Sequence, residues 1–160
     1  MIDGFDLGNS PRDVTEAQAP TLILSTTNGT RLLVDAAARF EHVYVGSLLN
    51  LDAVAAVARA HSDEVSVLCA GVLGELALDD AYTAGRIAEA LGGEPTDSAQ
   101  AAMRLVAGFR DEAEALHASR SGWNLRQQGM EDDIAWCAQA NMLGNAPRFA
   151  GLVGPAAAVV

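Results

Sequence analysis

Six consecutive small or polar residues could bind an anion: Ser25, Thr26, Thr27, Asn28, Gly29 and Thr30. Gly29 can adopt positive φ at little cost, so the backbone can turn sharply there. Asn28 or Thr30 can cap a helix that follows, and the free N–H groups of its first turn then point into the turn. Hydroxyl and amide donors at the positive end of a helix dipole suit phosphate or carboxylate oxygens. A capped turn with no ligand would use the same residues.

Adjacent carboxylates form a second candidate group. Asp79 and Asp80 precede an apolar helical pattern, and Glu75 lies a few residues before them. Neutral donors beside carboxylates suit an anionic substrate held together with a hard cation such as Mg²⁺. Carboxylates in a first helical turn also serve as ordinary caps, so the pattern leaves both interpretations open.

A strand–turn–helix pattern that occurs three times would position these groups. The expected strands are residues 22–24, 42–48 and 65–70, and the expected helices are residues 31–39, 51–60 and 79–91. Such repetition predicts a parallel sheet with helices packed on it. Right-handed crossovers place all three turns at the carboxyl edge of the sheet, where open α/β sheets bind ligands. Residues 26–30, 47–50 and 69–74 would line that edge.

The rest of the chain is predicted to be helical. Apolar residues at helical spacing indicate helices over residues 97–116, 123–128 and 131–142, and residues 145–149 suggest a last edge strand. No linker divides the sequence, so we expect residues 1–160 to form a single domain. The expected fold class is α/β, a three-layer sandwich with a mainly parallel sheet and a helical C-terminal part.

Composition excludes several classes of protein. The formal net charge is −11, which argues against nucleic acid and against an anionic membrane surface as partners. All ten basic residues are arginines, which excludes a P-loop lysine and a Schiff-base lysine. Cys69 and Cys137 lack metal-ligand spacing, and no apolar stretch is long enough to cross a membrane. We therefore expect reduced thiols and a cytoplasmic location.

Common phosphatase signatures are absent. A cysteine-dependent phosphatase needs an arginine six residues after its nucleophile, and that position after Cys69 is Glu75, which would repel phosphate. An aspartyl-phosphate enzyme needs two aspartates separated by one residue after a strand, whereas two residues separate Asp3 from Asp6. What remains is the predicted sheet edge itself.

Several blocks of residues together resemble one family. The blocks are residues 4–11 (GFDLGNSP), 25–30 (STTNGT), 45–47 with Asn50, 69–71 with Asp79 and Asp80, Gly129 with Asp133, and 147–149 (PRF). Together they resemble the 2-phosphosulfolactate phosphatase (ComB-like) family over almost the whole chain. The resemblance implies a three-layer α/β fold and Mg²⁺-dependent hydrolysis of the phosphate ester of sulfolactate, a step of coenzyme M biosynthesis.

The resemblance has two departures. Family members have Glu-Asp where this chain has Asp79-Asp80. They also carry a segment with Asp-x-x-Arg-Ala-Thr-Thr and Gly-Glu-Arg motifs ahead of the loop at residues 4–11. We therefore expect this chain to be truncated at its N-terminus, the C-terminal portion of the family's full domain.

Our hypothesis for the site combines the sheet edge with the resemblance. The expected catalytic residues are Asp6, Asn28 and Asp80, and the expected Mg²⁺ ligands are Asp6, Asp79 and Asp80. The expected substrate-binding residues are Asn9, Ser10, Thr26, Thr27, Gly29, Thr30, Asn50 and Gly71. The partner would be a small anionic phosphorylated substrate, and the chain would associate as a homodimer. Two alternatives stay open: a non-catalytic remnant that binds a small anion, and a phosphatase for another small phosphorylated acid.

Overall fold

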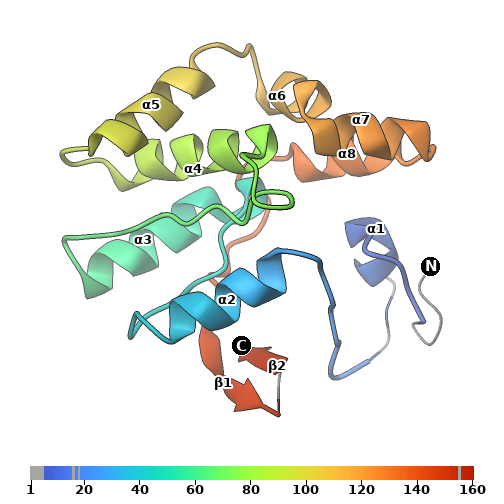
Figure 1. Cartoon of the computed structure of the whole chain (residues 1–160), viewed down its shortest axis with the longest axis horizontal. Coiled ribbons are helices and arrows are strands. Elements are labelled where there is room, and N and C mark those ends of the chain that lie inside the picture. Colours follow the sequence, from blue (N-terminus) through green and yellow to red (C-terminus); the bar gives the residue numbers. More distant parts are fainter. Residues whose placement is uncertain (1–5, 16, 18, 155) are drawn as a thin grey trace.

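The computed structural model describes residues 6–15, 17, 19–154 and 156–160, and consists mainly of helices (Figure 1). The helices are α1 (Pro11–Thr15), α2 (Gly29–Ala37), α3 (Leu51–His61), α4 (Leu78–Leu91), α5 (Asp97–Val106), α6 (Glu112–Ala118), α7 (Arg120–Gln127) and α8 (Glu131–Cys137), with a 3₁₀ turn η1 (Leu48–Asn50) before α3. The strands are β1 (Phe149–Val153) and β2 (Ala156–Val159). None of the described helices is long and apolar enough to span a lipid bilayer.

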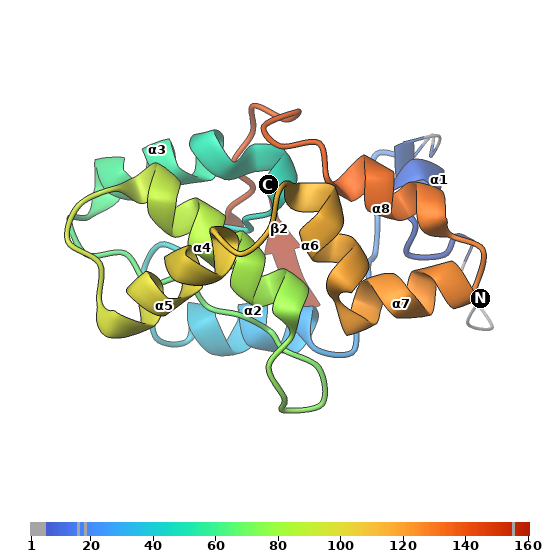
Figure 2. The same cartoon turned by 90° about the horizontal axis from the view of Figure 1, so that it is seen from above.

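Helix α4 is the centre of the packed part. It contacts α3, α5 and α6, which surround it when the molecule is seen from above (Figure 2). Tyr82 is 1% exposed and meets the ring of Phe109 edge-on, with the ring centroids 5.7 Å apart. Leu51 of α3 and Ala115 of α6 belong to the same buried cluster. Burial of these side chains is the main force that holds the helices together.

A glycine permits the closest contact in this packing. A Cβ atom at Gly85 of α4 would overlap the backbone carbonyl of Ala102 in α5, closer than real Cβ atoms come to other atoms. Glycine therefore lets α4 and α5 approach backbone to backbone. Helix α4 then ends at Gly92, whose φ of 65° is unfavourable for residues with a side chain.

The C-terminal residues form a hairpin, where the sequence suggested only one edge strand. Strand β1 pairs antiparallel with β2, and Arg148 pairs with Tyr44 as an isolated bridge. Val45 N donates to Pro147 O at 2.8 Å, and Phe149 N donates to Val43 O at 2.9 Å. The hairpin is thereby attached to the segment that leads into α3.

The predicted α/β sandwich with a mainly parallel sheet is wrong for the described residues. The sheet found there has two strands, β1 and β2, and they are antiparallel. Residues 22–24 and 65–70 follow non-helical paths without strand pairing, and residues 42–48 contribute one bridge. In Figure 1 the stretch that contains residues 65–70 is a coil that runs from the end of α3 back across that helix toward α4.

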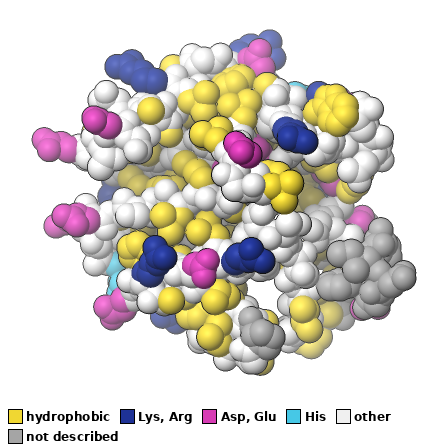
Figure 3. Space-filling view, in the orientation of Figure 1, with side chains coloured by type: hydrophobic (Ala, Val, Ile, Leu, Met, Phe, Trp, Pro, Cys, Tyr) yellow, Lys and Arg dark blue, Asp and Glu magenta, His cyan; other side chains and the backbone are white. Residues whose placement is uncertain are grey.

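The physical reason is pairing. A strand is stable only when its backbone groups bond to a neighbour and its apolar side chains are covered, and neither the composition nor the spacing of one segment supplies that neighbour. Leu22, Ile23 and Leu24 are 52%, 82% and 60% exposed. Figure 3, drawn in the orientation of Figure 1, shows hydrophobic side chains on the surface of the molecule.

The predicted helices are confirmed in part, with errors at their boundaries. The helices expected at residues 31–39, 51–60 and 79–91 correspond to α2, α3 and α4. The single helix expected over residues 97–116 is two helices, α5 and α6. Asp111 begins the second of them, because its carboxylate accepts a hydrogen bond from Glu114 N at 2.8 Å.

Candidate functional site

The turn before α2 is held by its own threonines. Thr26 Oγ1 accepts a hydrogen bond from Thr30 N at 3.1 Å, and Thr30 Oγ1 donates to Thr26 O at 3.0 Å. Asn28 occupies the N-cap position, but its side chain makes no capping bond. Thr26 therefore does the capping that the sequence assigned to Asn28 or Thr30. The Asn28 carboxamide makes no hydrogen bond to the described residues, so it is available to contact a ligand.

The carboxylates at the start of α4 are tied to the loop before it. Gly71 N donates to Asp80 Oδ2 at 2.7 Å. Gly71 has a φ of 65°, and a Cβ there would overlap the carbonyl of Glu75, so the loop needs glycine at this position. The structure thus places Gly71 beside Asp80 and fixes the orientation of that carboxylate. Asp79 lies next to it in the first turn of the helix.

Cys69 lies close to Asp80 and is not activated. Burial of the thiol, followed by the negative charge of Asp80, raises the pKa of Cys69 above its ordinary value. A thiol of raised pKa carries less of the thiolate that acts as a nucleophile. The environment therefore agrees with the sequence argument against a cysteine-dependent phosphatase.

One cavity of about 560 Å³ connects part of the predicted sheet edge. Its wall includes Gly29 at the start of α2, Ser47, Cys69, and Asp79 and Asp80 at the start of α4. The N-termini of two helices and a pair of carboxylates therefore line one cavity, although the parallel sheet whose carboxyl edge was expected to bring them together is not formed. Of the predicted residues in the turn before α2, Gly29 lines the cavity, whereas Thr26, Thr27, Asn28 and Thr30 do not.

Asn50 uses its side chain within the protein. Its Oδ1 accepts from Ser47 N at 2.8 Å and from Ser47 Oγ at 3.0 Å. Its Nδ2 donates to Val45 O at 3.1 Å and to Asn145 O at 3.0 Å. Since the residue is 4% exposed and both ends of its carboxamide are occupied, the geometry makes Asn50 a positioning residue for the cavity wall.

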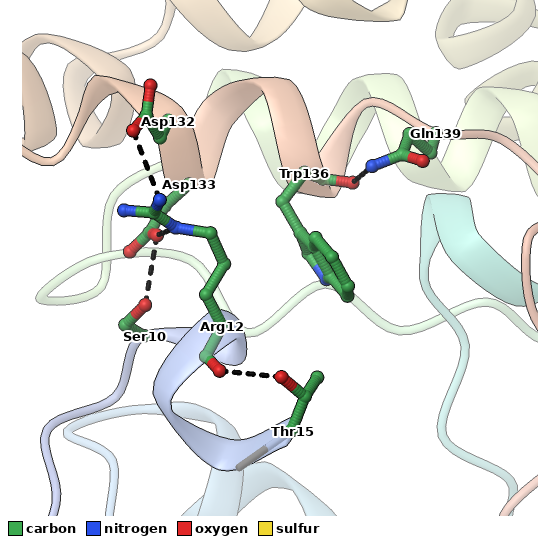
Figure 4. Close-up of polar contacts among 7 residues, drawn as sticks. All are labelled: Ser10, Arg12, Thr15, Asp132, Asp133, Trp136 and Gln139. Carbon is green, nitrogen blue, oxygen red and sulfur yellow. Dashed lines mark hydrogen bonds and ion pairs between the residues drawn. The ribbon is translucent and has the colours of Figure 1, made fainter.

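A second polar cluster joins α1 to α8 (Figure 4). Ser10 Oγ donates to Asp133 Oδ1 at 2.9 Å, and Arg12 Nε donates to the same oxygen at 2.8 Å. Arg12 also pairs with Asp132 at 3.1 Å. Asp133 is 2% exposed, so these bonds compensate the burial of its charge. The hydrogen bond to Asp133, and then the negative charges of Asp132 and Asp133, raise the pKa of Arg12.

This cluster divides the loop predicted to bind substrate. Ser10 is buried against Asp133, whereas Asp6 and Asn9 are exposed. Gly4 and Phe5 of the same loop lie outside the described residues. The sequence analysis did not single out Arg12. The adjacent carboxylates Asp132 and Asp133 were the available signal, since a buried carboxylate needs a partner of opposite charge and this one comes from a distant part of the chain.

The described residues do not assemble a complete metal site. Among them, no three His, Cys, Asp or Glu side chains come together as ligands, so Asp6 is not grouped with Asp79 and Asp80. The two adjacent carboxylates of α4 are oxygen donors of the kind that Mg²⁺ prefers, but they are too few for its octahedral shell. The predicted ligands Asp6, Asp79 and Asp80 therefore do not form a Mg²⁺ site in this structure.

Comparison with known proteins identifies the class. A family model described as 2-phosphosulpholactate phosphatase matches residues 1–151, and the chain belongs to this family.

Individual relatives carry the same name. The chain is 43% identical over 159 residues to a "Probable 2-phosphosulfolactate phosphatase" of Thermus thermophilus, an alignment that covers 95% of this chain and 67% of the relative. It is 40% identical to a "2-phosphosulfolactate phosphatase" of Methanothermobacter thermautotrophicus, covering 92% and 64%. A third relative, from Deinococcus radiodurans, is 41% identical and covers 86% and 60%. The chain spans about two thirds of the length of these relatives.

Proposed function

We propose that this chain forms part of a phosphatase that hydrolyses the phosphate monoester of 2-phosphosulfolactate to sulfolactate and phosphate. Membership of the family supports the reaction class, and the names of the relatives support the substrate. The observation in the structure that carries the proposal is the cavity between α2 and α4, which two helix N-termini and two carboxylates face. The proposal includes coenzyme M biosynthesis as the pathway and the cytoplasm as the location.

Hydrolysis of a phosphate monoester requires strong stabilisation of negative charge on the phosphoryl oxygens. The N-terminus of α2 offers backbone N–H donors and a positive dipole end, and the Asn28 carboxamide adds a neutral donor. Fixed donors of this kind cost no reorganisation during the reaction. In the proposed arrangement α2 binds the oxygens of the phosphate or the sulfonate.

The carboxylates of α4 have the complementary role. Asp80 is held by Gly71 N, so its Oδ2 is fixed while its other oxygen is available to accept a proton or a hydrogen bond from water. A carboxylate beside a bound phosphate can orient the attacking water as a general base. Mg²⁺ dependence is part of the proposal, but Asp79 and Asp80 are too few to hold the ion by themselves, so no step of the reaction is assigned to it.

The test is phosphate release from 2-phosphosulfolactate, with Mg²⁺ and again with excess chelator. It uses this chain and, for comparison, the whole Thermus thermophilus relative, of which the matched part is 67%. Asp80→Asn and Asn28→Ala are each expected to lower kcat/KM by about a hundredfold, the usual cost of losing one group that acts in the transition state. Asp97→Asn is the matched control, because Asp97 is a carboxylate in the first turn of α5 and does not line the cavity.

Substrate choice needs a separate comparison. An ester with a carboxylate in place of the sulfonate tests the alternative that the enzyme acts on another small phosphorylated acid. Turnover of the sulfonate ester that greatly exceeds turnover of the carboxylate ester supports the proposed substrate. Absence of phosphate release from both esters by this chain in folded form, alone and together with the unmatched part of the Thermus thermophilus relative, would contradict the proposed function.

A further inference from the structure

Two extended segments border the cavity without bonding to each other. Residues 42–49 and residues 64–70 both line it, together with side chains of α2, α3 and α4. No backbone hydrogen bond joins the two segments among the described residues. Neighbouring strands in a sheet lie about 4.8 Å apart and bond along their length, so these two segments are not sheet neighbours as they stand.

The backbone of residues 65–70 is unpaired in the described structure. Its N–H and C=O groups make no hydrogen bond to any residue that the structure describes. The flanking bonds fall outside it, at Glu64 N to Ser62 Oγ and at Gly71 N to Asp80 Oδ2. Backbone donors and acceptors require partners wherever water is excluded, so this segment is suited to pair with another strand.

The segment before η1 is paired along one edge. Val43 O and Val45 N bond to residues 147–149, and successive residues of a strand direct their polar groups to alternate edges. The N–H and C=O groups of Tyr44 and Gly46 therefore point to the opposite edge, where they have no backbone partner among the described residues. This edge is available for a strand.

The side chains around the cavity are mostly apolar. Val45, Val65 and Leu68 are 42%, 38% and 47% exposed, and Leu32 and Leu33 of α2 line the same space. Val67 packs instead against the buried cluster around Tyr82, so the segment is already seated on the core by that residue. An extended segment with apolar side chains would cover the exposed residues and satisfy the unpaired backbone in one step.

We call the part of the cavity between residues 42–49 and 64–70 the groove. We propose that the groove receives one or more added β-strands from the part of the family's polypeptide that lies outside the region aligned with this chain. About a third of each relative's length is outside the alignment, which is ample chain for strands of ordinary length. The proposal concerns an interaction surface and does not depend on the substrate of the enzyme. Seated between residues 42–46 and 65–68, the added segment would occupy the part of the cavity that these residues line and leave the end at Gly29, Asp79 and Asp80 to the substrate.

Charge argues against a second copy as the occupant. Each copy has a formal net charge of −11, and the carboxylates of Glu64, Asp79 and Asp80 line the groove itself. Two such surfaces repel one another at low ionic strength. The strands β1 and β2 also pair with each other, so neither is free to be donated to another copy.

The experiment combines this chain with the unmatched part of the Thermus thermophilus relative, produced as a separate polypeptide in the same cells. Copurification at a one-to-one ratio is expected. Hydrogen–deuterium exchange of residues 65–70 should slow at least about tenfold on binding, because ladder bonds protect strand amides. A scrambled polypeptide of the same composition is the control and should leave exchange unchanged.

Proline variants test the pairing mode. Val65→Pro and Ser66→Pro remove one N–H from each edge of the segment and should each weaken binding about tenfold or more. Val65→Ala and Ser66→Ala keep the N–H and should weaken it much less. Circular dichroism of each variant alone verifies that the helices have formed.

Each outcome decides the proposal. Slower exchange with a larger effect of proline than of alanine supports an added strand. Failure to bind the separate polypeptide, with residues 65–70 still exchanging freely, overturns it. A dimer of this chain in sedimentation that protects residues 65–70 without the added polypeptide also overturns it, because the occupant is then a second copy. Phosphatase activity is not used as a readout, so failure of the proposed function would not affect these results.

Discussion

Two regions of the molecule differ in how their apolar side chains and backbone groups are covered. The first is the helical layer, in which α3, α5 and α6 pack against α4, and the second is the groove lined by residues 42–49 and 64–70. In the helical layer, backbone bonds lie within each helix, and side chains such as Tyr82 are covered by neighbouring helices. In the groove, residues 65–70 expose both apolar side chains and unpaired backbone groups. A helix satisfies its backbone locally, whereas a strand depends on chain that is distant in sequence or on another molecule. The first region therefore buries its own surface, and the second is the surface that we propose pairs with added strands.

The largest expected effect comes from the core of the helical layer. Tyr82→Ala should lower the free energy of unfolding by about 3–5 kcal/mol, because it removes a large buried ring and leaves a cavity. Leu68→Ala in the groove should cost below about 1 kcal/mol, since Leu68 is 47% exposed. Urea denaturation followed by circular dichroism measures both. Equal losses would remove the contrast between the two regions.

A pair of glycine variants tests backbone approach. Gly85→Ala should lower the free energy of unfolding by about 2–3 kcal/mol, because its Cβ would overlap Ala102 of α5. Gly74→Ala meets no atom within 4 Å and is strained only by its φ of 83°, for about 1 kcal/mol. The same urea titration distinguishes them. A smaller loss at Gly85 than at Gly74 would show that the two helix backbones are not in contact.

The contact between α1 and α8 should have a smaller, local effect. Arg12→Ala leaves the buried Asp133 carboxylate with Ser10 alone and should lower the free energy of unfolding by less than Tyr82→Ala does, with faster hydrogen exchange confined to α1. Arg110→Ala is the control, because Arg110 is 78% exposed and its pair with Asp111 should contribute little. Unchanged exchange in α1 would mean that Arg12 does not hold the helix.

The smallest expected effect is chemical. The pKa of Cys69 is raised by burial and by the charge of Asp80, so less thiolate is present at pH 8 and alkylation by iodoacetamide should be slower than for a free cysteine. Asp80→Asn removes the negative charge, so the pKa should fall and the rate should rise. Cys137→Ser in both proteins confines the measurement to Cys69. If Asp80→Asn leaves the alkylation rate unchanged, the charge of Asp80 does not influence the Cys69 thiol, which would contradict this prediction.

What the sequence could predict follows the same division. Helices α2, α3 and α4 were predictable because apolar periodicity and terminal residues are local signals. The prediction of a parallel sheet was wrong, because residues 22–24 and 65–70 have the composition of strands but carry no information on a pairing partner. At the candidate site, Gly29, Asp79 and Asp80 line one cavity, but the parallel sheet from which the sequence argument grouped them is not formed. The bond from Arg12 to Asp133 spans 121 residues and could not be found from spacing.

Hydrogen–deuterium exchange of the chain alone tests the contrast most directly, since a single experiment reports on both regions. The account predicts strong protection of the amides in the middle of α4 and exchange close to the unprotected rate for residues 65–70. Protection of residues 65–70 comparable to that of α4, in a monomer shown by sedimentation, would contradict it.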